Sequence, residues 1–353
     1  MYINKYIIMF MLIVLFSSCN QPELASDANG HIQYSQYLDG NVRSFDIIND
    51  SLFVASEDYG VVVYKIMQSD GKIYLDSLTA TNVVGNPVTL DIAPESRSLI
   101  ILDDYNHTYI GKLDKLSSMS AVRCDDYQRK STFIDYSDKP IELITPFRHK
   151  PTQNEVDTLA WDTSFIHRIK FSEDVYAFDV YSGDCSDTLY KYLNYEIEDV
   201  FYNNEKLYLV NPEDTVYSVV SLIHEVSIDM FSVIDTLVLN DKPLTMKTNE
   251  NYMFIGLDDN QGCYIKLLDS NNLNHSNFSI ALGYDIQDIQ VSNDYIALSS
   301  GYDGSLVFDW NESGSPELSF LIGGIYAYKT VMYDDLNMIV GTKNGLHIYE
   351  IER

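Results

Sequence analysis

The chain has 353 residues, of which 46% are hydrophobic and 21% charged, and this composition of a globular protein with a large core excludes wholesale disorder. Asp and Glu outnumber Lys and Arg by 52 to 23, so the formal net charge is −29. Such a chain repels the phosphate backbone of DNA and RNA, and we therefore expect no nucleic-acid partner. Tyr, Phe and Trp make up 13% of the residues, which favours strands over helices.

The N-terminal segment is typical of a secretion signal. Ile7 to Phe16 is an unbroken apolar run, which as a helix would rise about 15 Å, half the thickness of the hydrocarbon core of a bilayer. The run is too short for a lasting membrane span, so residues 1–18 are predicted to be a signal peptide. Ser17, Ser18 and Cys19 follow the apolar run.

This sequence resembles the lipobox of bacterial lipoproteins, in which the signal peptidase cuts before a cysteine whose thiol carries diacylglycerol. The resemblance implies that Cys19 is lipidated and that residues 19–29 form a tether, while a plain secretory signal is the alternative. Two or three acyl chains would make the membrane anchor stable. Because Asn20 rather than Asp follows the cysteine, the resemblance also implies an outer-membrane lipoprotein of the cell envelope, facing either the periplasm or the cell surface.

Residues 30–353 contain a repeated pattern of strands and turns. Each copy has a strand with a small polar residue in its middle, a turn, a run such as LFVAS, an acidic or glycine-rich turn, and an alternating strand such as GVVVYKI. A fourth strand-like piece lies between copies, so each copy predicts one four-stranded propeller blade. Six copies, one of them diverged, cover residues 41–66, 87–113, 197–222, 243–268, 285–310 and 327–352.

The spacing of the small polar residues predicts the number of blades. These residues are Ser44, Thr89, Asp199, Thr245, Asp288 and Thr330, and successive ones lie 45, 110, 46, 43 and 42 residues apart. The step of 110 residues leaves room for one further blade within about 130–196, whereas two further blades would be shorter than any other. The sequence therefore predicts an all-β, seven-bladed β-propeller with four-stranded blades in a single domain, residues 30–353.

The two ends of this domain are expected to complete one blade together. The last copy ends after three strands, and the segment before the first copy resembles the pieces between copies. Pairing His31–Leu38 with Leu346–Ile351 would close the ring and leave no open sheet edge. The N-terminal strand is therefore predicted to close the last blade.

The repeat as a whole resembles the LVIVD-repeat β-propeller proteins of bacteria and archaea. The similarity is clearest in residues 41–66 and 285–352 and weakest in residues 117–196. It implies a propeller fold and often a secreted or anchored location, but no common activity, and a fold alone does not identify a function.

Sequence motifs for catalysis are absent from the chain. There is no Gly-x-Ser-x-Gly, His-Glu-x-x-His or Cys-x-x-Cys, and the seven histidines are scattered among the copies. If Cys19 is lipidated, Cys124, Cys185 and Cys263 remain, so at least one thiol is expected to be free. The sequence favours a non-enzymatic binding or scaffold module, and the alternative is a lactonase-type hydrolase with a metal held in the axial channel.

Acidic residues recur in the turn between the second and third strands of the copies. In a propeller these turns share one face with the loops between blades, so we expect a negatively charged rim. Its candidate ligand-binding residues are Asp58, Asp104, Asp214, Asp259 and Asp303. Such a rim would attract a basic partner protein. No cofactor is expected, and the alternative is that the rim binds Ca²⁺, although Asp is also simply a good turn residue.

Tyrosines lie at or near the same turns. They are Tyr59, Tyr105, Tyr302 and Tyr326. Exposed tyrosines stack on sugars and anchor protein partners, so the expected ligand is an envelope protein or glycan.

Overall fold

The computed structural model describes residues 32–351, apart from 82–83, 95–96, 106, 119, 123–126, 129–131, 135–141, 149–162, 171–187, 194–196, 204, 213–215, 226–229, 269–276 and 311–314. The predicted signal peptide, Cys19 and the tether lie outside these residues, as do His31 and Asp214. The described helix η1 (Leu116–Ser118) is one turn of 3₁₀ helix, and no helix among the described residues is long and apolar enough to cross a bilayer.

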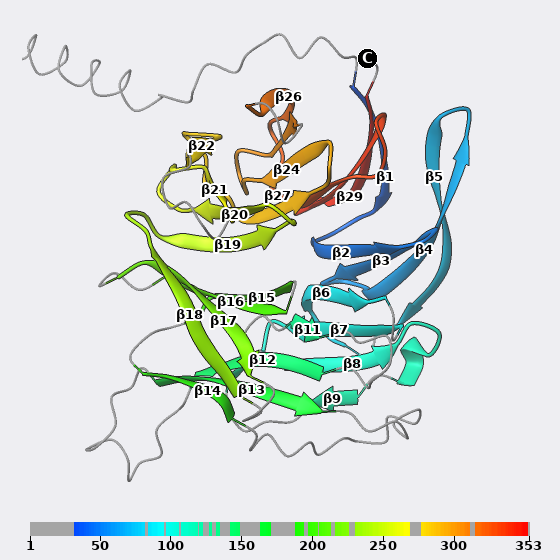
Figure 1. Ribbon diagram of the computed structural model, residues 1–353. Coiled ribbons are helices and arrows are strands. Elements are labelled where there is room, and N and C mark those ends of the chain that lie inside the picture. The colour runs from blue at the N-terminus through cyan, green and yellow to red at the C-terminus, as the bar shows by residue number, and fades with distance from the viewer. Residues whose placement is uncertain are drawn as a thin grey trace, which may run out of the picture.

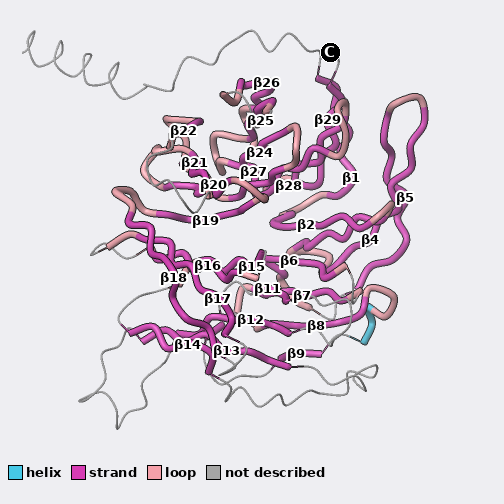
Figure 2. Tube along the Cα trace, viewed as in Figure 1, coloured by secondary structure: helices cyan, strands magenta, loops and turns pink. Residues whose placement is uncertain are grey.

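Six four-stranded antiparallel blades form most of the molecule (Figures 1 and 2). The first two contain β2 (Val42–Ile48), β3 (Ser51–Ser56), β4 (Gly60–Ser69) and β5 (Lys72–Thr81), and β6 (Pro87–Ala93), β7 (Ser98–Asp103), β8 (Thr108–Lys112) and β9 (Ser120–Val122). Two more contain β15 (Asp199–Asn203), β16 (Lys206–Asn211), β17 (Ser218–Glu225) and β18 (Met230–Val238), and β19 (Pro243–Thr248), β20 (Tyr252–Leu257), β21 (Cys263–Leu267) and β22 (Phe278–Ile280). The fifth contains β23 (Asp288–Val291), β24 (Tyr295–Ser299), β25 (Ser305–Asp309) and β26 (Glu317–Ile322). The sixth, here called the closing blade, contains β27 (Ala327–Met332), β28 (Asn337–Thr342), β29 (Gly345–Ile351) and β1 (Ile32–Leu38).

The prediction of seven four-stranded blades is wrong. The described structure has six, and the segment expected to supply another four-stranded blade forms a five-stranded sheet instead. Its strands are β10 (Tyr127–Gln128), β11 (Thr132–Ile134), β12 (Glu142–Arg148), β13 (Thr163–Lys170) and β14 (Thr188–Leu193). Two short strands pair with the same edge of β12, β10 near its C-terminal end and β11 near its N-terminal end.

The physical reason for this difference is the length of the segment. The step of 110 residues exceeds two regular repeats, and repeat spacing assumes that every copy supplies one strand at each place in a sheet. In this sheet two short strands, β10 and β11, together occupy the position beside β12. The irregular sheet lies between the β6–β9 and β15–β18 blades, because β11 contacts both β6 and β15.

The predicted closure is confirmed for residues 32–38. β1 pairs antiparallel with β29, so that Ile32 lies opposite Ile351 and Leu38 opposite Leu346. In Figure 1 the blue β1 runs beside the red β29. Gly345 allows this approach, since its φ is +138° and a Cβ atom there would lie 1.9 Å from the Leu38 carbonyl oxygen.

Apolar side chains fill the space between neighbouring blades. The second strand of each blade is buried along most of its length because each of its faces packs against another sheet. Cys263 is fully buried, and this burial raises the pKa of its thiol to about 12. The Cys263 thiol is free and stays protonated in the folded protein, whereas Cys124 and Cys185 lie outside the described residues.

The small polar residues that define the repeat form hydrogen bonds between blades. The Ser44 hydroxyl accepts a bond from the Leu90 backbone N–H at 3.2 Å. Asp199 Oδ2 accepts bonds from the Thr245 hydroxyl at 3.0 Å and the Met246 N–H at 3.3 Å. These groups are buried, so each bond satisfies polar atoms that would otherwise be costly in the core. The sequence analysis used these residues only for their spacing.

Candidate functional site

The turns between the second and third strands share one face of the molecule with the loops between blades. Backbone hydrogen bonds join a turn to a loop in three blades: Glu57 N–H to Asn41 O at 3.0 Å, Asp104 N–H to Asn86 O at 3.1 Å, and Asp258 N–H to Lys242 O at 2.9 Å. We call this face, made of these turns and loops, the loop face. It carries the predicted acidic rim.

The structure places four of the five predicted rim residues on the loop face, each on a different blade. Asp58, Asp104 and Asp259 are exposed, Asp303 is half-buried, and Asp214 lies outside the described residues. Within the described part of the chain, no group of three or more His, Cys, Asp or Glu side chains could hold a metal ion. The rim residues are therefore spread around the face and not gathered at one centre.

Acidic residues next to two of the rim positions have partners in their own turn or in the adjoining loop. Asp103 Oδ1 accepts hydrogen bonds from the backbone N–H groups of Tyr105 and His107 at 2.9 and 2.8 Å. Asp258 pairs with Lys242 at 2.9 Å, and this hydrogen bond raises the pKa of Lys242. For these residues the simpler interpretation, that Asp supports a turn, is adequate.

Asp303 differs from these turn residues. Burial raises the pKa of Asp303, and the nearby carboxylate of Asp285 raises it further. Asp285 is itself held by the Asn260 backbone N–H, which donates to Oδ1 at 2.6 Å. Two carboxyl groups, one in the loop before β23 and one in the β24–β25 turn of the same blade, therefore influence each other on the loop face.

Exposed tyrosines lie beside the rim residues. Tyr59, Tyr105 and Tyr302 are 44%, 66% and 78% exposed. The ring centroids of Tyr302 and Tyr326 are 4.5 Å apart in an edge-to-face arrangement, and those of Tyr326 and Tyr328 are 4.6 Å apart. We call Tyr302, Tyr326 and Tyr328 the tyrosine row.

The tyrosine row ends at the axial cavity. The Tyr328 hydroxyl donates to Asn41 Oδ1 at 3.1 Å, and the Arg43 guanidinium carbon lies 5.8 Å from the centroid of the Tyr328 ring. Arg43 also forms an ion pair with Glu57 on the adjacent turn. The tyrosine row thus extends from the exposed loop face to the axial cavity, which Tyr328 and Arg43 line.

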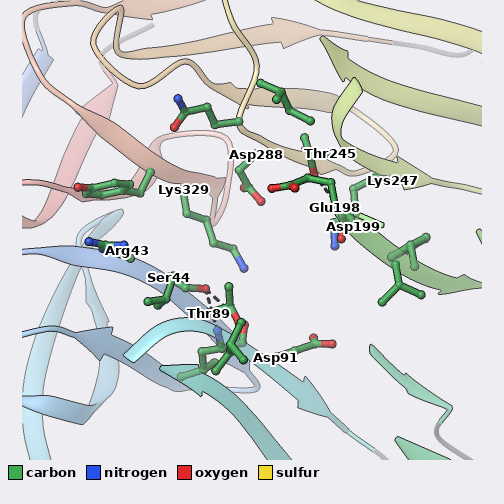
Figure 3. Close-up of a pocket in the computed structure, with 18 of the residues that line it drawn as sticks. Arg43, Ser44, Thr89, Asp91, Glu198, Asp199, Thr245, Lys247, Asp288 and Lys329 are labelled. Carbon is green, nitrogen blue, oxygen red and sulfur yellow. Dashed lines mark hydrogen bonds between the residues drawn. The ribbon is translucent and has the colours of Figure 1, made fainter. Parts of the chain in front are cut away.

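The axial cavity has a volume of about 420 Å³ and a strongly charged lining. Residues near the starts of the innermost strands line most of this cavity. The cavity therefore lies at the loop-face end of the propeller axis. The charged lining residues are Arg43, Asp91, Glu198, Asp199, Lys247, Asp288 and Lys329 (Figure 3). This cluster of charged side chains was not predicted from the sequence, although charged residues close to the small polar positions are the signal that could have found it.

Cations and carboxylates in the cavity influence one another. Figure 3 shows Lys329 reaching from β27 toward the side of the cavity formed by β2 and β6. The Nζ atoms of Lys329 and Lys247 lie 5.7 Å from the Phe45 ring centroid and 4.7 Å from that of Phe201. Burial raises the pKa of Asp91, Asp46 raises it further, and Lys247 and Lys329 partly offset both effects.

Comparison with known proteins identifies the fold. Neither a protein-family model nor a curated protein matches this chain, and its resemblance to LVIVD repeats stays a prediction. YCF48 bound to D1 peptide has a TM-score of 0.58 and 10% identity over 91% of this chain and 97% of that chain. The WD40 β-propeller domain of Doa1 has a TM-score of 0.59 and 13% identity over 92% and 98%. The protein is a β-propeller. At such low identity the similarity shows the fold alone.

A buried histidine in the closing blade of this propeller predicts a pH-dependent stability. His347 on β29 is 7% exposed, and burial lowers its pKa. The unfolded chain binds a proton near pH 6.5, whereas the folded chain binds it only at lower pH. The contribution of His347 to the free energy of unfolding is therefore complete above about pH 6.5 and is lost as the pH falls from there toward the folded pKa.

Urea unfolding at about pH 7.5 and about pH 5 tests this prediction. The pKa values of half-buried Asp91 and Asp303 are raised, so these groups affect stability with the opposite sign. The quantity to compare is therefore the difference in the free energy of unfolding between wild type and His347→Gln. We expect the stability advantage of wild type over His347→Gln to shrink at the lower pH. The exposed His107→Gln is the control. Parallel pH profiles for wild type and His347→Gln would contradict the prediction.

Proposed function

We propose that this propeller is a lipid-anchored binding module of the bacterial cell envelope that captures a protein partner on its loop face. The observation that carries the proposal is the presence of exposed tyrosines, Tyr59, Tyr105 and Tyr302, on the turns of three blades of one face. Protein interfaces are enriched in tyrosine and arginine, and the residues that contribute most to binding are often of these types. The solved structure of YCF48 with D1 peptide is that of a similar fold with a peptide bound, which supports the proposal.

The charge of the chain indicates the kind of partner. The formal net charge is −29, and the rim residues add exposed carboxylates around the tyrosines. A partner with a basic surface would be steered to this face, and its association rate would fall steeply with ionic strength. An acidic partner would be repelled.

Photo-crosslinking in cells tests where the partner binds. We would place a photoreactive amino acid at residue 302 on the loop face, and at exposed Asp294 in the β23–β24 turn as a matched control on the same blade. Turns between the first and second strands lie at the opposite ends of the strands from the loop face. We expect a crosslinked protein from residue 302 only, and several-fold less of it when Tyr59→Ser and Tyr105→Ser are added. Equal yields from the two positions, or no crosslink from residue 302, would overturn the proposal.

The proposed lipid anchor has a separate test. Intact-mass measurement on the full chain from native membranes should show a mature protein that begins at Cys19 and carries the mass of its acyl chains. The Cys19→Ser variant should lose that mass and leave the membrane fraction. A Cys19→Ser chain that still sediments with membranes would exclude anchoring through this residue.

A further inference from the structure

We propose, as a refinement that rests on the proposed function, that the β24–β25 turn and the loops before β23 and before β27 form a subsite for one arginine or lysine side chain of the partner protein. The subsite comprises Tyr302, Tyr326, Asp303, Asp285 and Ser300. These residues come from three successive stretches of chain that the ring brings together.

Two tyrosines form the aromatic wall of this subsite. Tyr302 is 78% exposed, while Tyr326 is half-buried and supports it edge-to-face. The Tyr326 hydroxyl donates to Gln287 Oε1 at 3.3 Å, which restrains the supporting ring. The Tyr302 ring remains accessible to a cation, which the electron-rich face of an aromatic ring attracts.

Asp303 and Asp285 supply the negative charge. In two of the equivalent turns one acidic side chain has a basic partner on the protein: Glu57 pairs with Arg43, and Asp258 pairs with Lys242. Asp285 is the only charged group among the described residues that shifts the pKa of Asp303, and it does so by repulsion. A cation placed between the two carboxyl groups would remove this repulsion.

Ser300 supplies hydrogen-bonding capacity at the base of the turn. It is 2% exposed, and its hydroxyl has no hydrogen-bond partner among the described residues. Ser300 directly follows β24, and alternation along the strand puts its side chain on the same face as that of Leu298. Leu298 belongs to the same apolar cluster as Ile286, the residue after Asp285, so Ser300 lies on the side of the strand that faces the loop carrying Asp285. A buried polar group without a partner requires an explanation, and a ligand donor provides one.

These features fit a basic side chain better than a metal ion or a sugar. Ca²⁺ takes six to eight oxygen ligands, and the described residues offer no group of three acidic or histidine side chains at one point. A guanidinium or ammonium group combines a positive charge with several N–H donors, and it can contact an aromatic face and carboxylates at the same time. A neutral sugar would leave the repulsion between Asp285 and Asp303 in place.

Nuclear magnetic resonance on the full chain with ¹³C-labelled tyrosine rings tests the subsite. The probe is Nα-acetyl-arginine methylamide, and the equally long neutral Nα-acetyl-glutamine methylamide is the control ligand. We expect the arginine derivative to shift the ring signals of Tyr302 and Tyr326, assigned with Tyr302→Phe and Tyr326→Phe, and the glutamine derivative to leave them unchanged. Asp303→Asn and Tyr302→Ser should each raise the dissociation constant about two- to fivefold. Asp294→Asn, which removes an exposed carboxylate at the opposite end of the blade, should not.

The outcomes distinguish this inference from the proposed function. Equal shifts with the arginine and glutamine derivatives, or an affinity that Asp303→Asn leaves unchanged, would overturn the subsite. If residue 302 crosslinks to a protein in cells while the arginine derivative causes no shift, the loop face binds a partner but the subsite is wrong. If the arginine derivative binds while residue 302 yields no crosslink, the subsite stands and the proposed function fails.

Discussion

Deletion of residues 32–38 is expected to remove most of the stability of the propeller. β1 is the outermost strand of the closing blade, and its pairing with β29 joins the first described strand to the last. Without β1, the edge of β29 would lose its hydrogen-bond partners. Tyr37 and Leu38 would also leave the cluster that contains Phe45, Leu346 and Ile348. We expect a loss of about 5 kcal/mol or more in the free energy of unfolding, which is comparable to the whole stability of many domains.

Urea denaturation followed by tryptophan fluorescence and near-ultraviolet circular dichroism measures this loss. A deletion of equal length in the predicted tether, residues 22–28, is the control and should leave the midpoint unchanged. Gly345→Val offers an independent way to disturb the closure, since a Cβ atom at residue 345 would overlap the Leu38 carbonyl oxygen. An unfolding midpoint that neither change lowers would show that the ring does not depend on its closing strand.

Phe254→Ala is expected to cost about 3–5 kcal/mol in the free energy of unfolding. Phe254 is fully buried on β20 and belongs to a cluster shared by the β19–β22 and β23–β26 blades. Its ring centroid lies 5.2 Å from that of Trp310, with an interplanar angle of 81°. The substitution removes the aromatic contact and leaves a cavity between two blades, so it weakens the interface as well as one sheet.

Denaturant unfolding of Phe254→Ala measures the cost, and Trp310 fluorescence reports on the same cluster. Tyr74→Ala is the control, because Tyr74 on β5 is 46% exposed and its loss should cost about 0.5 kcal/mol or less. A cost below about 1 kcal/mol for Phe254→Ala would mean that the two blades repack around the missing ring and that the cluster is not as tightly packed as the structure indicates.

Local patterns in the sequence predicted most of the strands and the closure of the ring. Alternation in GVVVYKI and GLHIYEI corresponds to β4 and β29, and the resemblance of the N-terminal segment to the pieces between copies predicted β1. These predictions succeeded because strand formation and the burial of alternate residues depend on neighbours in the chain. The count of four-stranded blades failed in residues 127–193, where repeat spacing could not show that two short strands share one edge of β12.

The strand pattern, the small polar residue in each innermost strand, and the placement of acidic residues and tyrosines in the turns can all be read from the amino-acid sequence. Which of these residues come into contact follows only from the way the blades pack. Asp285 precedes β23 and Asp303 follows β24, so the folding of one blade brings both to the loop face, whereas the Tyr302–Tyr326 contact joins the β24–β25 turn to the loop before β27 of the next blade. The tyrosine contact depends on the angle and spacing at which neighbouring blades pack, and these are set by the apolar cores between the sheets and not by any local pattern.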